Sequence, residues 1–98
     1  MKIKELTIRK NAAAALDVSW KLSGGGQTSY DLFLIQNGSV IERVRTPSPV
    51  TSCRLRTVPE PMTDYALLLT VRSGEQISTA RTGYCPTKSI PMYQNIIY

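Results

Sequence analysis

The side chains that most often perform catalysis or bind metals are scarce in this chain. Its 98 residues include no histidine, two cysteines and seven carboxylates. Without histidine, the Ser-His-Asp and Cys-His arrangements that activate a nucleophile cannot be assembled. Two thiols also fall short of the four ligands of a structural zinc site. We therefore expect no catalytic residue, no metal site and no cofactor, in a protein that is not an enzyme.

Three short motifs have structural explanations as well as chemical ones. The run Gly24-Gly25-Gly26 lacks the Gly-Lys-Ser/Thr ending of a phosphate-binding loop, so we expect a flexible connection. Asn37-Gly38-Ser39 fits a glycosylation sequon, but Asn-Gly is also the preferred pair of a tight hairpin turn. Cys53 and Cys85 could form one disulfide. We favour two reduced thiols, with Cys53 as a small core residue.

The net charge of +5 comes from basic residues that are scattered along the chain. Because no run of five or six occurs, we expect no nucleic-acid-binding arm, although weak binding with a steep salt dependence stays an alternative. A solvated basic surface is the simpler expectation. A patch for an acidic partner would consist of Arg43, Arg45, Arg54 and Arg56. No apolar run approaches the roughly 20 residues of a membrane helix, so no membrane contact is expected.

The elements that must position these residues are short strands separated by turn signals. Residues 16–22 give the clearest pattern, because Leu16, Val18, Trp20 and Leu22 alternate with polar residues. The other strands are expected at 3–10, 30–36, 39–45, 50–56, 65–71 and 77–84. No helical stretch is visible. This pattern predicts an all-β fold, a seven-stranded antiparallel β-sandwich.

Two aromatic residues on these strands resemble a known family. Trp20 lies on the second strand and Tyr30 opens the third, as in the fibronectin type III family of immunoglobulin-like sandwiches. The resemblance covers about residues 3–85. It implies that Trp20 belongs to the core and that the third and sixth strands are neighbours.

The corner before the sixth strand carries the same resemblance. The family pattern is Leu-x-Pro-x-Thr-x-Tyr, and Pro61, Thr63 and Tyr65 match it. Pro59 stands at the leucine position, and we expect Val58 to substitute for the leucine. The resemblance implies that the Tyr65 ring caps the core and that its hydroxyl bonds the backbone a few residues upstream.

Parity on the third and sixth strands predicts an interaction surface. Tyr30, Leu32 and Leu34 should point inward, which leaves Phe33 and Ile35 outside. Leu68 should face outward on the neighbouring sixth strand. We expect these outward residues to form an apolar patch that a partner protein or the chain's own tail covers. The alternative is that long neighbouring side chains merely shield Phe33 and Ile35.

We expect residues 1–85 to form the sandwich and residues 86–98 to form a tail. The tail contains the apolar residues Met92, Tyr93, Ile96, Ile97 and Tyr98. We expect it to dock on another subunit, slightly in preference to adding a strand to its own sheet.

The first functional hypothesis is a structural, protein–protein interaction module. The chain begins with methionine and shows no leader, so we expect a small accessory or decoration protein of a bacteriophage particle, in the virion or on an extracellular surface. Its partner would be another subunit or a copy of itself. A carbohydrate-binding module is the alternative, with Tyr84, Tyr93 and Tyr98 as aromatic residues outside the predicted core. An adhesion or receptor fragment would require an oxidising compartment.

Overall fold

The structure is a computed structural model that describes residues 2–10, 15–24, 29–47, 50–85 and 93–97. The described residues form eight strands and no helix, which confirms the all-β prediction. The predicted number of seven strands was one too few, because the tail contributes an eighth. The strands are β1 (Lys2–Lys10), β2 (Leu16–Ser23), β3 (Ser29–Gln36), β4 (Ser39–Pro47), β5 (Ser52–Arg54), β6 (Tyr65–Ser73), β7 (Gln76–Tyr84) and β8 (Tyr93–Ile97).

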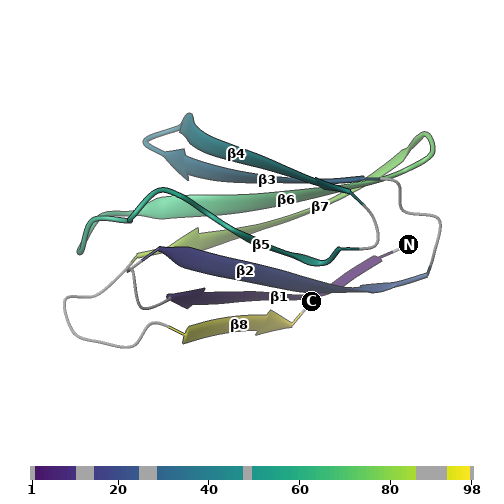
Figure 1. Ribbon diagram of the computed structural model, residues 1–98, viewed down its shortest axis with the longest axis horizontal. Helices are drawn as coiled ribbons and strands as arrows, with labels where there is room; N and C mark the ends of the chain where they lie inside the picture. The colour runs from purple at the N-terminus through teal and green to yellow at the C-terminus, as the bar shows by residue number, and fades with distance from the viewer. Residues whose placement is uncertain (1, 11–14, 25–28, 48–49, 86–92, 98) are drawn as a thin grey trace.

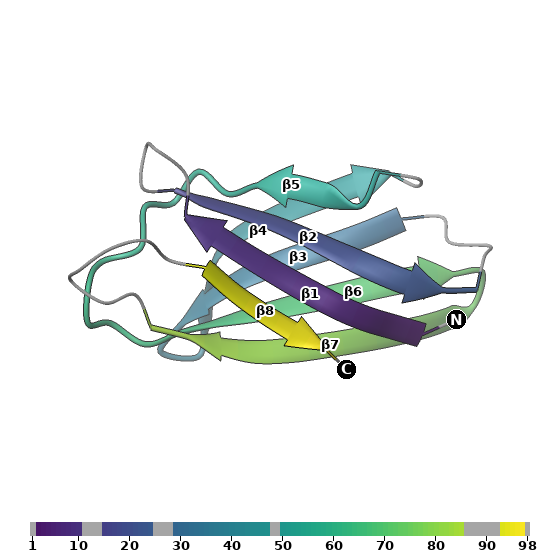
Figure 2. The same cartoon turned by 90° about the horizontal axis from the view of Figure 1, so that it is seen from below.

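The strands form two antiparallel sheets that lie one above the other (Figure 1). The strand order is β5-β2-β1-β8 in one sheet, the β1 sheet, and β4-β3-β6-β7 in the other, the β3 sheet. Seen from below, the β1 sheet lies in front of the β3 sheet (Figure 2). The third and sixth strands are therefore neighbours, with Leu32 opposite Leu69 and Phe33 opposite Leu68.

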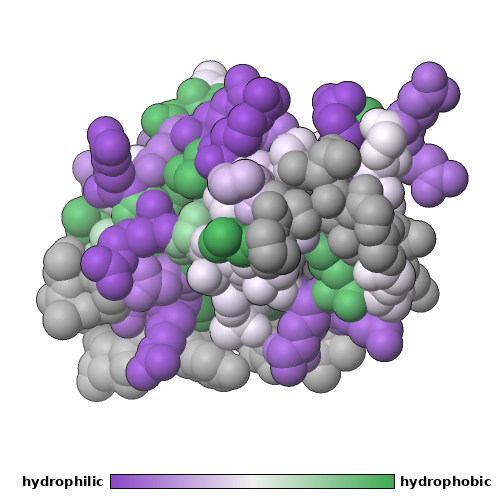
Figure 3. Space-filling view, turned by 45° about the vertical axis from the view of Figure 1, so that its right-hand side comes forward, coloured by the Kyte–Doolittle hydropathy of each residue, from purple (hydrophilic) through white to green (hydrophobic). Residues whose placement is uncertain are grey.

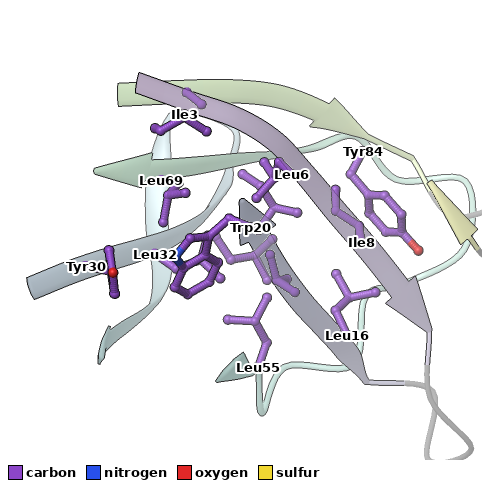
Figure 4. Close-up of a cluster of buried hydrophobic side chains, with 14 of the residues drawn as sticks. Ile3, Leu6, Ile8, Leu16, Trp20, Tyr30, Leu32, Leu55, Leu69 and Tyr84 are labelled. Atoms are coloured by element: carbon purple, nitrogen blue, oxygen red, sulfur yellow. The ribbon is translucent and has the colours of Figure 1, made fainter. Parts of the chain in front are cut away.

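Alternating residues of both sheets fill the space between them (Figure 4). Trp20 of β2 and Tyr30 of β3 meet edge to face across the sheets, with ring centroids 5.3 Å apart and planes at 64°. The fully buried side chains include Leu32, Leu67 and Leu69, each at most 1% exposed. Because strand side chains alternate between faces, this core forces Phe33 and Leu68 to the outer face of the β3 sheet.

Two turns follow the expected local chemistry. Asn37 and Gly38 have φ of 52° and 78°, as a two-residue hairpin between β3 and β4 requires. At the corner before β6, the hydroxyl of Tyr65 accepts a hydrogen bond of 2.8 Å from the backbone N–H of Glu60. Our expectation for Val58 was wrong, because that side chain is 53% exposed. Pro59, which stands at the leucine position, is itself buried.

The fifth strand is shorter than predicted. The sequence pattern indicated residues 50–56, but β5 spans only Ser52–Arg54. Single hydrogen bonds extend the contact with β2, from the N–H of Trp20 to the carbonyl of Thr51 and from the N–H of Leu55 to the carbonyl of Leu16. Leu55 is fully buried, so this residue contributes to the core although it lies outside the strand pairing of β5 with β2.

Residues 93–97 of the tail belong to the domain's own sheet. They form β8, which pairs antiparallel with β1, with Glu5 opposite Ile97 and Arg9 opposite Tyr93. This pairing satisfies backbone groups on an edge of β1 that would otherwise face solvent. Met92 and Tyr98 lie outside the described residues, and for the predicted tail residues Tyr93, Ile96 and Ile97 the structure describes the backbone.

Candidate functional site

The outer face of the β3 sheet carries a row of four residues across its four strands. Arg43 of β4 lies opposite Phe33, Phe33 opposite Leu68, and Leu68 opposite Arg81 of β7. Ile35 lies two residues along β3 from Phe33, on the same face. Phe33, Ile35 and Leu68 are all half-buried, and we call them the Phe33 patch. The structure thus brings these three predicted residues together on one outer face.

Part of the cover of the Phe33 patch comes from an arginine. The guanidinium carbon of Arg43 lies 5.6 Å from the centroid of the Phe33 ring, within the range of a cation–π interaction. This contact matches the shielding alternative, since a long neighbouring side chain covers one side of the ring. Phe33 remains half-buried, so the guanidinium over its ring covers it only in part.

Asp31 binds two arginines on this face. Its carboxylate accepts hydrogen bonds from Arg43 Nη2 at 3.3 Å and from Arg45 Nε at 3.0 Å. Burial raises the pKa of Asp31, but the hydrogen bond and charge of Arg45 and the charge of Arg43 outweigh it and lower the pKa below its ordinary value. Sequence analysis missed this group. Its parity with Phe33 was the available signal, because it placed Asp31 on the outer face.

The outer face of the β1 sheet has the opposite character. Its described outward side chains on β1, β2 and β5 are polar or charged: Glu5, Thr7, Arg9, Asp17, Ser19, Lys21, Ser52 and Arg54. Ion pairs at 3.8 Å (Lys21 with Glu5) and 2.8 Å (Arg54 with Asp17) cross this face. The side seen in Figure 3 shows hydrophobic groups scattered among hydrophilic ones. Of the two sheets, the β3 sheet therefore has the more apolar described outer face.

All four arginines of the predicted basic patch line one surface groove. The groove has a volume of about 620 Å³ and runs between β4 and residues 54–57, so we call it the β4 groove. One wall is the continuous stretch Ile41–Arg45 of β4. Arg54, Arg56 and Thr57 form the other wall. The structure thus brings together β4 of the β3 sheet and the segment that begins at the end of β5 in the β1 sheet.

Glu42 joins the two walls of the β4 groove. Its carboxylate accepts hydrogen bonds of 2.7 Å from the backbone N–H of Arg56 and from the backbone N–H of Thr57. Partial burial raises the pKa of Glu42, but these hydrogen bonds and the charge of Arg56 outweigh it, so the pKa lies below its ordinary value. Sequence analysis missed this link, and no sequence signal marks it.

The two thiols are free, and they differ in their surroundings. Cys53 on β5 is half-buried against the core, and burial with the charges of Glu42 and Asp17 raises its pKa to about 11. Cys85 is exposed. Neither environment produces the low-pKa thiolate that a catalytic cysteine needs.

One aromatic residue of the carbohydrate hypothesis was misplaced. Tyr84 ends β7 in the core and is 4% exposed, because it shares parity with the buried Ala80. Figure 4 shows Tyr84 among the buried hydrophobic side chains. Its buried hydroxyl has no hydrogen-bond partner among the described residues. It cannot offer an exposed stacking platform to a sugar.

Within the described ranges, no group of three or more metal-ligating side chains occurs, and no helix is long and apolar enough to cross a membrane. Comparison with known proteins gives no match: no family model, curated protein or solved structure matches the chain.

Proposed function

We propose that the chain is a fibronectin type III-like sandwich that acts as a non-enzymatic interaction module. It would dock as an accessory or decoration subunit on a larger protein assembly, such as a bacteriophage particle. Three features support the family resemblance: the adjacent third and sixth strands, the Trp20–Tyr30 contact, and the hydrogen bond to the corner residue Tyr65.

The Phe33 patch is the observation that carries the interaction. Its three apolar side chains lie side by side on an outer face, where water contacts them unless a partner covers the patch. Residues 93–97 do not cover this patch, because β8 lies at the far edge of the other sheet, beside β1. Of the covers that the sequence suggested, these residues leave a partner protein beside the partial shielding of the Phe33 ring by Arg43.

The composition of the patch suits a protein partner. Protein interfaces combine an apolar centre with arginine and aromatic side chains and a polar rim. Here Phe33 and Leu68 form the centre, and Arg43 and Arg81 stand at the two ends of the row. Arg43 is already held by Asp31 and by the Phe33 ring, so less side-chain entropy is lost when a partner binds.

The test is to replace Phe33 and Leu68 singly by serine and to measure binding to the native assembly isolated from the source of the chain. Central apolar interface residues are often worth about 2 kcal/mol, so each variant should weaken binding by about 30-fold. The matched control is Val58→Ser, which removes an exposed apolar side chain away from the patch. Urea unfolding of each variant shows whether the domain remains folded. Unchanged binding by both folded patch variants would refute the proposal.

A further inference from the structure

The β4 groove is a second surface, on the edge of the domain. β4 is the terminal strand of the β3 sheet, so within the described part of the chain it pairs with a strand on one side only. Five consecutive residues of this strand, Ile41–Arg45, line the groove. Side chains of consecutive strand residues point to opposite faces, so a wall built from all five is the strand edge itself. The groove therefore presents backbone hydrogen-bonding groups as well as side chains.

Guanidinium groups border this edge on both sides. Arg43 and Arg45 stand on the β4 wall, and Arg54 and Arg56 stand on the opposite wall. Three of them are held by carboxylates outside the groove walls: Arg43 and Arg45 by Asp31, and Arg54 by Asp17. Arg56 makes no such ion pair among the described residues.

The bound carboxylates leave most arginine donors available. An arginine has five N–H donors in a rigid fork. Asp31 uses only Nη2 of Arg43, and it uses Nε and Nη2 of Arg45, while Asp17 uses Nε of Arg54. Glu42 also lines the groove, but its two oxygens already accept backbone N–H groups of the opposite wall. Donors therefore outnumber the acceptors that the groove itself supplies.

We propose that the β4 groove binds an extended acidic segment of a partner protein, which adds to β4 as a fifth strand of the β3 sheet. Backbone hydrogen bonds to β4 supply the alignment, as in other cases of strand addition. Carboxylates on successive residues of the segment point to opposite faces, so they reach Arg43 and Arg45 on one side and Arg54 and Arg56 on the other. A nucleic acid could use the arginines but has no peptide backbone to pair with the strand edge.

The β4 groove shares Arg43 with the Phe33 patch, and the experiment separates the two surfaces by variants that do not touch Arg43. The probe is a fluorescent octapeptide of four successive glutamates flanked by threonine pairs, which presents carboxylates on both faces of an extended strand, titrated against the whole chain at low salt. Binding is followed by fluorescence anisotropy, and amide hydrogen exchange is followed for residues 41–45. The controls are the lysine–threonine peptide, the acidic peptide with alternate backbone nitrogens methylated, and a single-stranded oligonucleotide.

The expected result is binding of the acidic peptide with slower exchange at amides of residues 41–45. The lysine peptide and the methylated peptide should bind at least about tenfold more weakly. The double variant Arg54→Gln, Arg56→Gln should lose about five- to tenfold in affinity, since each exposed charge contact is worth little alone. Leu68→Ser, a patch variant whose residue lies opposite Arg81 on β7, should bind the peptide like the original chain.

Three results would overturn the groove proposal. They are equal binding of the methylated peptide, tighter binding of the oligonucleotide without exchange protection at residues 41–45, and undiminished peptide binding by the double arginine variant. If Leu68→Ser loses the peptide while the double arginine variant keeps it, the peptide occupies the Phe33 patch instead. The proposed function itself would survive all of these outcomes, because its assay measures binding of the native assembly.

Discussion

Two buried tyrosines should respond differently to the loss of one oxygen atom. The hydroxyl of Tyr65 accepts a 2.8 Å hydrogen bond from the Glu60 N–H at the corner before β6. The hydroxyl of Tyr84 is buried without a partner among the described residues. Tyr65→Phe therefore removes a made hydrogen bond, whereas Tyr84→Phe removes a desolvated group that gains nothing from the fold.

The structure sets the size of each effect. Tyr65 is 6% exposed, so its substitution should cost about 1–2 kcal/mol, the net value of a buried hydrogen bond including an amide left partly unsatisfied. Tyr84→Phe should be neutral or stabilise the protein by up to about 1 kcal/mol, since no bond is lost. The ring and its packing are unchanged in both variants, so each serves as the control for the other.

Urea unfolding monitored by the fluorescence of Trp20, the single tryptophan, measures both variants. With a slope of about 1–1.5 kcal/mol per molar urea, Tyr65→Phe should lower the midpoint by about 1 M. Tyr84→Phe should leave the midpoint unchanged or raise it. An equal loss in both variants, or no loss for Tyr65→Phe, would refute the assignment of the corner hydrogen bond.

Three further predictions concern charge, thiols and the hairpin. The folded pKa of Asp31 lies below its ordinary value of 3.8, so its contribution to stability is complete above pH 3.8 and is lost as the pH falls through the folded pKa. Asp31→Asn should therefore flatten the fall in urea midpoint between pH 5 and pH 2. An unchanged pH profile would contradict this prediction. At pH 8 a thiol reagent should modify exposed Cys85 first and Cys53 far more slowly, because burial raises the pKa of Cys53 to about 11. A single fast phase for both thiols would count against the buried position of Cys53. Gly38 has φ of 78°, so Gly38→Ala should lower the free energy of unfolding in urea by about 1 kcal/mol. At Gly83 an added Cβ meets no atom closer than 4.0 Å, so Gly83→Ala should lower it by less. Equal losses of stability in the two variants would argue against the hairpin geometry.

The sequence was most informative where a local pattern decides the structure. Alternation placed Trp20 and Leu32 inside and Phe33 outside, and Asn37-Gly38 marked the hairpin. These features depend on the two-residue period of a strand and on backbone angles, both of which are local properties. The resemblance of the corner also anticipated the hydrogen bond of Tyr65.

The parts that sequence analysis missed depend on register between distant strands. Asp31 meets Arg43 and Arg45 only because β3 and β4 pair with one particular offset. That offset shifts between Leu34 and Ile35, where Glu42 and Val40 are the successive partners, and no sequence signal fixes such an irregularity.

Other missed features depend on contacts between the two sheets. Glu42 reaches the backbone of Arg56 and Thr57 across the edge of the domain. The four arginines were named from the sequence as a group, but their arrangement around one groove follows from this link. Tyr84 was misplaced because the inward parity of β7 is weakly marked, with Ala80 and Tyr84 as its only buried residues.

The most direct test of the central claim is the native mass of the complex that contains this chain in its source, for the original chain and for Phe33→Ser. The account predicts a particle far heavier than the 10.9 kDa of the chain, from which the Phe33→Ser chain is largely lost while the Val58→Ser chain stays bound. An original chain that occurs only at 10.9 kDa, or a particle that retains Phe33→Ser as well as the original chain, would contradict it.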